Sequence, residues 1–373
     1  MLTRRHLRIK VLQALYAFFQ SENDRVDVAE RQLLQSLEKI YDLCIYHLSF
    51  LIELNEFAAQ RLEEGKLKHR PTPEDLNPNL RFVKNSLIYQ IKRNRDFQQR
   101  ADSLKIHWND QENLIRKIYN QLKETTMYQQ YMNAPVTGFK QDKELVVYLF
   151  NELVVNNNVV QFIYEEKNIF WTNDQHTENL KITRTSFTDE DTINYADREI
   201  VQKLYKRYAD EDGNLEILCE EDSIYPENDY YFAAYIVNKI LRDWREISDE
   251  YTPLPPLLRS LPGDENDKEF MQMLFRKTII HKAKFNEIVS KHAQNWELDR
   301  IATMDILIIQ IALTELTQFP SIPIKVSMNE YIDLAKIFST PKSSQFINGL
   351  LDKMVAELKE DKTIVKTGRG LLE

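Results

Sequence analysis

The stretch Asp299–Leu316, DRIATMDILIIQIALTEL, decides the fold of this chain. Its apolar residues surround almost the whole circumference of a helix, a pattern typical of a helix that neighbouring helices bury on several sides. Glycine supports the same interpretation, because 7 glycines in 373 residues fall far below the usual frequency of about 7 %. We find no convincing run of alternating strand pattern. The sequence therefore predicts an all-helical protein.

Helical patterns continue on the C-terminal side of this stretch. Pro320 and Pro323 break the chain, and Ser327-Met-Asn-Glu330 then has the spacing of a capping box, in which the serine oxygen accepts from an orphan amide. A further helix is expected to begin at Thr340-Pro341, with proline at the first helical position. Four residues are expected to form the buried stripe of the helix that follows Pro323: Met328, Ile332, Ala335 and Phe338.

At the N-terminus, apolar residues recur at helical spacing from Arg4 to Gln20, which predicts an amphipathic helix. Arg5, Arg8 and Tyr16 lie beside its apolar stripe at ~100° per residue, so we expect two arginines and a tyrosine to share one exposed strip. Similar patterns predict seven helices before residue 299: Val26–Glu64, Arg81–Asp102, Asp110–Tyr131, Lys143–Ile169, Ala196–Tyr208, Tyr230–Ile247 and Lys268–Gln294.

The net charge of −9 comes from one acidic block. Residues 188–230 carry 14 Asp and Glu against 4 Lys and Arg, whereas the first twenty residues carry four basic residues and no acid. Outside the block the chain is close to neutral. A basic N-terminal segment of this kind is compatible with a nucleic-acid contact on one face of the protein.

Several kinds of chemistry lack a signature in this sequence. It contains no GxGxxG and no GxxxxGK[ST], which argues against a dinucleotide site and a phosphate loop. The 7 histidines form no HExxH motif, and Cys44 and Cys219 stand in no motif. Isolated cysteines favour a reducing compartment, and no uncharged apolar stretch reaches the ~18 residues of a membrane span. We therefore expect a cytoplasmic protein without a membrane segment that is not an enzyme and has no cofactor or metal.

The two ends of the chain together resemble the NusB family of bacterial transcription antitermination factors. Arg4-Arg5-His6-Leu7-Arg8, followed by Gln13-Ala14-Leu15-Tyr16, is similar to the family's arginine-rich opening and its QALY motif. Four later segments match family motifs in the correct order: Ile308–Leu316 (IIQIALTEL), Pro323–Glu330 (PIKVSMNE), Asp333–Lys336 (DLAK) and Phe346–Asp352 (FINGLLD). The resemblance implies an all-α, NusB-like helical domain with a large helical insertion after the first helix.

The same resemblance implies a discontinuous NusB-like RNA-binding domain made of residues 1–25 and 264–362. Residues 26–263 would then be the helical insertion, which includes the acidic block, and residues 363–373 a frayed tail. Within the insertion, residues 142–174 match residues 267–299 at 8 of 33 positions. A degenerate repeat and two core helices of similar length are both compatible with these matches.

The family resemblance also implies RNA binding without catalysis. NusB-like proteins pair with NusE, a small-subunit ribosomal protein, and the pair binds single-stranded boxA RNA and helps the RNA polymerase elongation complex pass terminators. By position, the family's RNA-contacting segment corresponds to Arg4, Arg5, Arg8 and Tyr16, and guanidinium and aromatic groups suit phosphates and unpaired bases. Three lysines in or near the C-terminal motifs complete the predicted RNA-binding set: Lys325, Lys336 and Lys342.

Each of these residues also has a structural interpretation. The arginines could belong to a solvated N-terminal turn, and a tyrosine beside an apolar stripe is more often a packing residue. His6 stands where the family tends to have another arginine, so we expect that one phosphate contact is missing or depends on pH. Gly349 inside a helix costs roughly 1 kcal/mol relative to alanine, which predicts that another backbone approaches it closely.

Two other functions fit parts of the sequence. The chain could be an interaction scaffold in ribosome biogenesis, with the acidic block 188–230 either docking a basic partner or covering the RNA site. It could also be the RNA-guiding module of an rRNA-modifying enzyme, although the middle of the chain has neither a glycine-rich cofactor loop nor a catalytic cysteine motif.

Overall fold

The computed structural model describes residues 2–21, 25–136, 138–160, 163, 229–260, 266–293, 301–339 and 341–372. Within these ranges all regular secondary structure is helical and no β-strand occurs, which confirms the all-α class. The predicted helix Ala196–Tyr208, and the acidic block as far as residue 228, lie outside the described residues. The chain divides into two compact units, one built around residues 2–36 and 257–372 and the other around residues 37–160 and 229–256.

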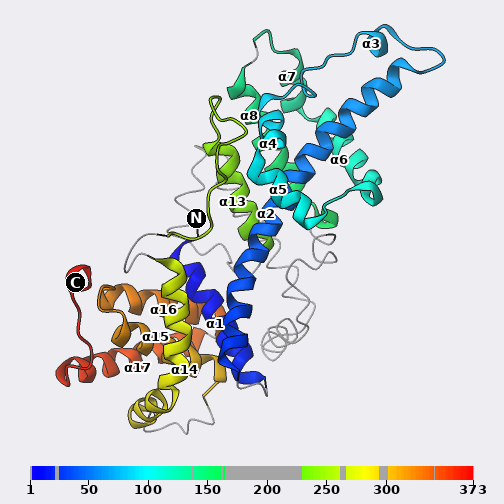
Figure 1. Ribbon diagram of the computed structural model, residues 1–373. Helices are drawn as coiled ribbons and strands as arrows, with labels where there is room; N and C mark the ends of the chain where they lie inside the picture. The colour runs from blue at the N-terminus through cyan, green and yellow to red at the C-terminus, as the bar shows by residue number, and fades with distance from the viewer. Residues whose placement is uncertain are drawn as a thin grey trace. The chain divides into compact units, whose positions relative to one another are not determined.

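The first unit contains the two ends of the chain (Figure 1). Its helices are α1 (Arg4–Gln20), the beginning of α2 (Val26–Lys66), α14 (Asp267–His292), α15 (Thr303–Gln318), α16 (Ile324–Phe338), α17 (Pro341–Glu360) and the short 3-10 helix η5 (Gly368–Leu371). Helix α15 packs against α1, α14, α16 and α17. Every residue from Leu307 to Leu316 is at most 2 % exposed, so the helix expected to be buried on several sides is the centre of this unit.

Helix α16 begins earlier than the predicted capping box. Pro323 occupies the position before its first residue, with extended backbone angles, so the helix begins at Ile324. Ser327 therefore lies inside the helix, where it is buried, and Glu330 bonds to Arg5 instead of capping. The predicted capping box is wrong, whereas the predicted start of the next helix at Pro341 is confirmed.

The buried stripe of α16 is only partly the predicted one. Met328 and Ala335 are buried, but Ile332 and Phe338 are half-buried. Tyr331 and Leu334, at most 1 % exposed, complete the stripe.

The second unit combines the remainder of the long helix α2 with several shorter helices. The shorter helices are α3 (Pro73–Leu76), α4 (Ser86–Arg93), α5 (Arg95–Leu104), η1 (Asn109–Gln111), α6 (Glu112–Glu124), α7 (Thr126–Asn133), α8 (Phe139–Tyr148), the π-helix η2 (Leu149–Val155) and α13 (Asp229–Asp243). Two long predicted helices are each divided in two because Asn94 and Thr125 act as N-caps, accepting from the amides of Phe97 and Tyr128. Asn94 also donates to the carbonyl of Thr252 at 2.6 Å, which holds this break in place.

The C-terminal residues are packed rather than frayed. The amide of Thr367 donates to the carbonyl of Pro320 at 3.0 Å, and Lys366 Nζ donates to the carbonyl of Phe319 at 2.9 Å. Gly370 lies so close to Pro320 that a Cβ atom would overlap the proline carbonyl. The segment therefore rests on the connection between α15 and α16, in contrast to the predicted tail.

Gly349 does not have the expected close neighbour. A Cβ atom built on this residue meets nothing within 4 Å, and the residue is exposed on α17. The predicted backbone approach is therefore wrong.

Among the described residues, no helix combines the length and apolar character needed to cross a lipid bilayer.

Candidate nucleic-acid interface

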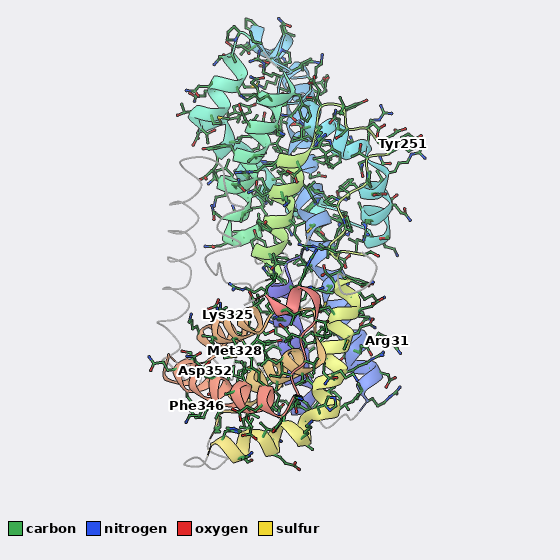
Figure 2. The ribbon with its side chains drawn as sticks, turned by 90° about the vertical axis from the view of Figure 1, so that its left-hand side faces the viewer. Arg31, Tyr251, Lys325, Met328, Phe346 and Asp352 are labelled. Carbon is green, nitrogen blue, oxygen red and sulfur yellow. The ribbon has the colours of Figure 1, made fainter. Side chains whose placement is uncertain are left out.

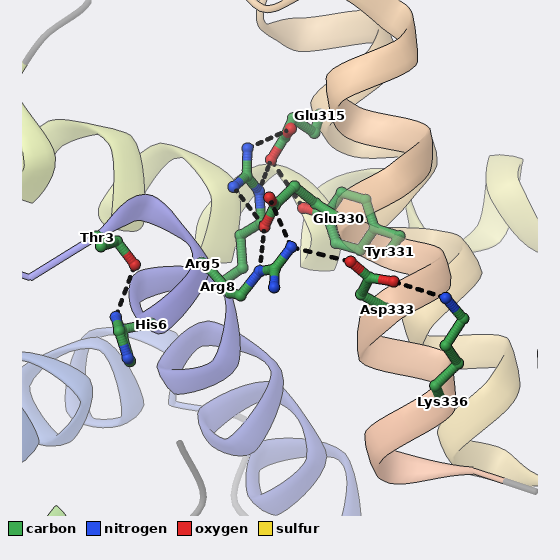
Figure 3. A network of polar contacts seen from close by, with 9 residues as sticks. All are labelled: Thr3, Arg5, His6, Arg8, Glu315, Glu330, Tyr331, Asp333 and Lys336. Atoms are coloured by element: carbon green, nitrogen blue, oxygen red, sulfur yellow. Dashed lines mark hydrogen bonds and ion pairs between the residues drawn. The ribbon is translucent and has the colours of Figure 1, made fainter. Parts of the chain in front are cut away.

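Arg8 lies inside the first unit. Its Nε and Nη2 atoms donate to the two carboxylate oxygens of Glu315 at 2.7 and 2.8 Å, and its Nη1 atom lies 3.3 Å from Glu330 Oε2 (Figure 3). The side chains of Arg8 and Glu315 are 4 % and 0 % exposed. Burial alone would lower the pKa of Arg8, but the adjacent carboxylate of Glu315 raises it above its usual value. All three guanidinium nitrogens are thus held by carboxylates inside the protein.

Glu315 connects three helices. Besides Arg8 of α1, it accepts hydrogen bonds from Ser327 Oγ at 2.7 Å and from the Tyr331 hydroxyl at 2.9 Å, both on α16. Burial works to raise the pKa of this carboxyl, but the charge of Arg8 and these hydrogen bonds lower it below its usual value. The carboxylate is charged and fully bonded, and it fixes α1 and α16 on α15.

Arg5 faces α16 and is partly accessible. Its Nε and Nη2 atoms donate to Glu330 at 3.1 and 3.2 Å, and Nη2 also donates to Asp333 at 2.9 Å. The other oxygen of Asp333 accepts from Lys336 Nζ at 2.9 Å (Figure 3). The structure thereby brings two of the predicted RNA-binding residues, Arg5 and Lys336, to the two sides of one carboxylate.

Lys325 and Lys336 lie on the outer face of α16. Both are exposed, as is Asn329 between them, and Figure 2 shows Lys325 on this helix. Spacings of four and seven residues put the three side chains within ~40° of one another around the helix axis, over a length of roughly 16 Å. The two lysines thus form one accessible basic stripe, with Arg5 at its edge.

Arg4 faces a different helix. Its Nε atom lies 3.7 Å from Asp267 of α14, and its guanidinium lies 4.6 Å from the ring centre of Phe270. The side chain is 27 % exposed, and burial lowers the pKa of Arg4 even though Asp267 opposes that change. Arg4 and Arg5 therefore point to α14 and α16 respectively.

The predicted exposed strip on α1 is not exposed. Arg8 is 3 % exposed and Tyr16 is 9 % exposed, and Lys10 on the same helix is 6 % exposed. The side chain of Lys342 is not among those that the structure describes. Of the predicted set, the accessible side chains are thus Lys325 and Lys336, with Arg4 and Arg5 partly accessible.

His6 is held neutral beside the arginines. Its Nδ1 atom lies 2.7 Å from Thr3 Oγ1. Burial, with the positive charges of Arg5 and Lys10, lowers its pKa to about 3. The imidazole therefore carries no charge near neutral pH and does not replace an arginine there.

The acidic side of this network is not among the residues predicted from the sequence. The arginines are held by three carboxylates, those of Glu315, Glu330 and Asp333. Of these, only Glu315 can be recognised in the sequence, because an acid in the middle of an otherwise apolar stretch requires a buried partner. No group of three or more His, Cys, Asp or Glu that could hold a metal ion occurs in the part of the chain that the structure describes. Cys44 is buried, which raises the pKa of its thiol.

Comparison with known proteins connects the C-terminal part of the chain to one family. The NusB family profile matches residues 232–356, which begins earlier than the predicted boundary at 264 and does not include residues 1–25. Transcription antitermination protein NusB of Salinibacter ruber is 42 % identical over 112 residues, which are 30 % of this chain and 70 % of that protein. The proteins of the same name from Chloroherpeton thalassium and Bacillus licheniformis are 39 % and 36 % identical, over 30 % and 31 % of this chain and 53 % and 87 % of their own lengths. No solved structure matches the chain.

Proposed function

Because this chain belongs to the NusB family of transcription antitermination proteins, we propose that it is a non-catalytic RNA-binding factor of the cytoplasm. It binds a boxA-like single-stranded RNA together with NusE and acts on the RNA polymerase elongation complex during ribosomal RNA synthesis. The observation that carries this proposal is the basic stripe of α16, Lys325 and Lys336, with Arg5 of α1 beside it.

Arg5 is suited to bind a phosphate without leaving its place. Its Nε and Nη2 atoms bond to Glu330 and Asp333, whereas Nη1 makes none of these bonds (Figure 3). The remaining terminal nitrogen can donate to a phosphate oxygen while the carboxylates keep the fork oriented. Lys336, which is 62 % exposed, and Lys325 supply point charges along the same face.

Arg8 has a different role in this proposal. Its guanidinium is buried and held by Glu315 and Glu330, so it positions α1 rather than touching RNA. Arg4, which packs over Phe270 and is 27 % exposed, offers a weaker contact at the α14 side. The accessible cations for RNA are thus divided between α1 and α16.

The experiment compares RNA binding by the wild-type protein with NusE and by the triple variant Arg5→Ala/Lys325→Ala/Lys336→Ala. We expect the slope of log affinity against log salt concentration to fall by about 0.7 for each phosphate of a single strand that the variant no longer binds. The control is Lys353→Ala/Lys359→Ala, which removes exposed lysines from α17. Unchanged affinity and slope in a folded triple variant would exclude α16 as the RNA surface.

The role of NusE needs a separate measurement. A pull-down of NusE by this chain, with and without boxA-like RNA, is expected to recover NusE and to recover more of it when the RNA is present. Absence of NusE under both conditions would remove it from the proposal, while RNA binding by the chain alone would still be measurable.

A further inference from the structure

Helix α14 presents a second basic face in the first unit. Its segment Arg276–Lys284, RKTIIHKAK, contains four Lys and Arg, one histidine and no acid. Neither composition nor the family resemblance draws attention to it, because the residues around it restore neutrality.

Two of its lysines lie on one exposed stripe. Lys277, Ile280 and Lys284 follow one another at spacings of three and four residues, which places them on the same side of a helix. Ile280 is 67 % exposed, Lys284 is exposed and Lys277 is half-buried. Within the described part of the chain, neither lysine forms a hydrogen bond or an ion pair.

The pKa of His281 is affected by the positive charges of these two lysines. Partial burial lowers its pKa below the usual 6.5, and the positive charges of both Lys277 and Lys284 lower it further. The two charges that shift the pKa of His281 are thus those of Lys277 and Lys284. Lys277 and Lys284 thus place two positive charges beside His281, although the whole chain has a net charge of −9.

The other two cations of the segment serve the packing of the unit. Arg276 Nε donates to the buried carboxylate of Glu30 at 2.7 Å, and Lys282 Nζ lies 3.8 Å from the ring centre of Phe19. Because these contacts hold α2 and α1 against α14, Arg276 and Lys282 are unsuitable for an RNA-binding test. Lys277 and Lys284 can be changed without disturbing them.

Along the helix axis, the stripe lies beyond the part of α14 that contacts Arg4. The two helices pair in the same order along the chain, with Arg4 beside Asp267 and Phe19 beside Lys282. Lys277 and Lys284 lie ten and seventeen residues beyond Asp267, so they are about 15 and 26 Å further along the helix axis at 1.5 Å per residue.

We propose that Lys277 and Lys284 bind phosphates of the single-stranded RNA that flanks the boxA-like element, so that α14 lengthens the RNA-binding path of the first unit. This inference rests on the proposed function. Single-stranded RNA fits better than an acidic protein, because a protein interface has an apolar core and the stripe offers only Ile280 and Met273, which is 37 % exposed.

The experiment uses the full chain with NusE and two RNAs, one limited to the boxA-like element and one with single-stranded extensions on both sides. For Lys277→Ala/Lys284→Ala, we expect unchanged affinity for the short RNA. For the long RNA, the slope of log affinity against log salt is expected to fall by about 1.4, which is about 0.7 for each of two phosphates. The control Lys353→Ala/Lys359→Ala should leave both slopes unchanged, and circular dichroism verifies that each variant is folded.

The outcomes separate the two proposals. If the wild-type chain binds neither RNA in the presence of NusE, the proposed function and this inference both fail. If it binds the short RNA but the α14 variant keeps the wild-type slope on the long RNA, this inference alone is overturned. Polyglutamate, measured in parallel, represents an acidic protein. Loss of polyglutamate binding in the α14 variant with unchanged RNA binding would likewise overturn the inference and would assign the stripe to an acidic protein.

Discussion

Arg8 of α1 donates two hydrogen bonds to Glu315 of α15, at 2.7 and 2.8 Å, although 307 residues separate them in the chain. Both side chains are withdrawn from water, and Ser327 and Tyr331 bond to the remaining lone pairs of the carboxylate. The pair therefore determines where the N-terminal helix lies on α15 and α16. An arginine that the family motif associates with RNA is thus buried against a carboxylate in this chain.

Replacing Arg8 with alanine is expected to destabilise the first unit strongly. The substitution leaves Glu315 as a buried charge without its cation, and breaking a buried pair in this way costs about 3–5 kcal/mol. Urea unfolding followed by circular dichroism measures the loss. Arg8→Met/Glu315→Met, which removes both charges, should recover part of it, and a cost below about 1 kcal/mol for the single variant would show that the pair is not structural.

His6 is expected to make stability depend on pH on the acid side of neutrality. Its pKa is about 3 in the folded protein, below the usual 6.5, because of burial and the charges of Arg5 and Lys10. The unfolded chain therefore binds the proton first, so the contribution is complete above pH 6.5 and decreases as the pH falls toward 3. His6→Asn should unfold with a shallower pH dependence in this window, by up to about 1.4 kcal/mol per pH unit. Equal pH dependence in the two proteins would contradict the neutral histidine.

Gly349→Ala is expected to stabilise the protein. The glycine lies inside α17, is exposed, and has no atom within 4 Å of the position that a Cβ would take. Alanine restricts the unfolded chain and favours the helix by roughly 0.5–1 kcal/mol. Thermal unfolding should show a higher midpoint, whereas a lower midpoint would mean that the glycine has a packing role after all.

Gly370→Ala is expected to release the C-terminal segment without unfolding the helices. A methyl group at this position overlaps the carbonyl of Pro320, which is backbone and cannot move aside easily. The hydrogen bonds of Lys366 and Thr367 to Phe319 and Pro320 should then open. Limited proteolysis should cut this segment faster than in the wild type, while the circular dichroism of the helices stays unchanged. Equal protection from proteolysis would argue against the packed arrangement.

Local signals in the sequence predicted most of the helical architecture. Apolar residues on every side of Asp299–Leu316 indicated the central helix, and Pro341 marked the start of α17. The divisions at Asn94 and Thr125 also have a local signal, since both are good N-cap residues, although the predicted helices Arg81–Asp102 and Asp110–Tyr131 extend across them. At Ser327 a local signal was misleading. The spacing of a capping box is present there, but the helix already begins at Ile324, directly after Pro323.

The sequence by itself determined the fold class, the family and the set of basic residues, because helical periodicity and short motifs depend on neighbouring residues in the chain. Only the tertiary structure decided how those basic residues are used. Arg8 became a buried partner of Glu315, Arg5 a neighbour of Asp333, and Lys325 and Lys336 an accessible stripe. The physical reason is that a helical period gives the angle at which a side chain leaves its helix. Packing of the helices decides whether that side chain then meets water, a carboxylate or another helix.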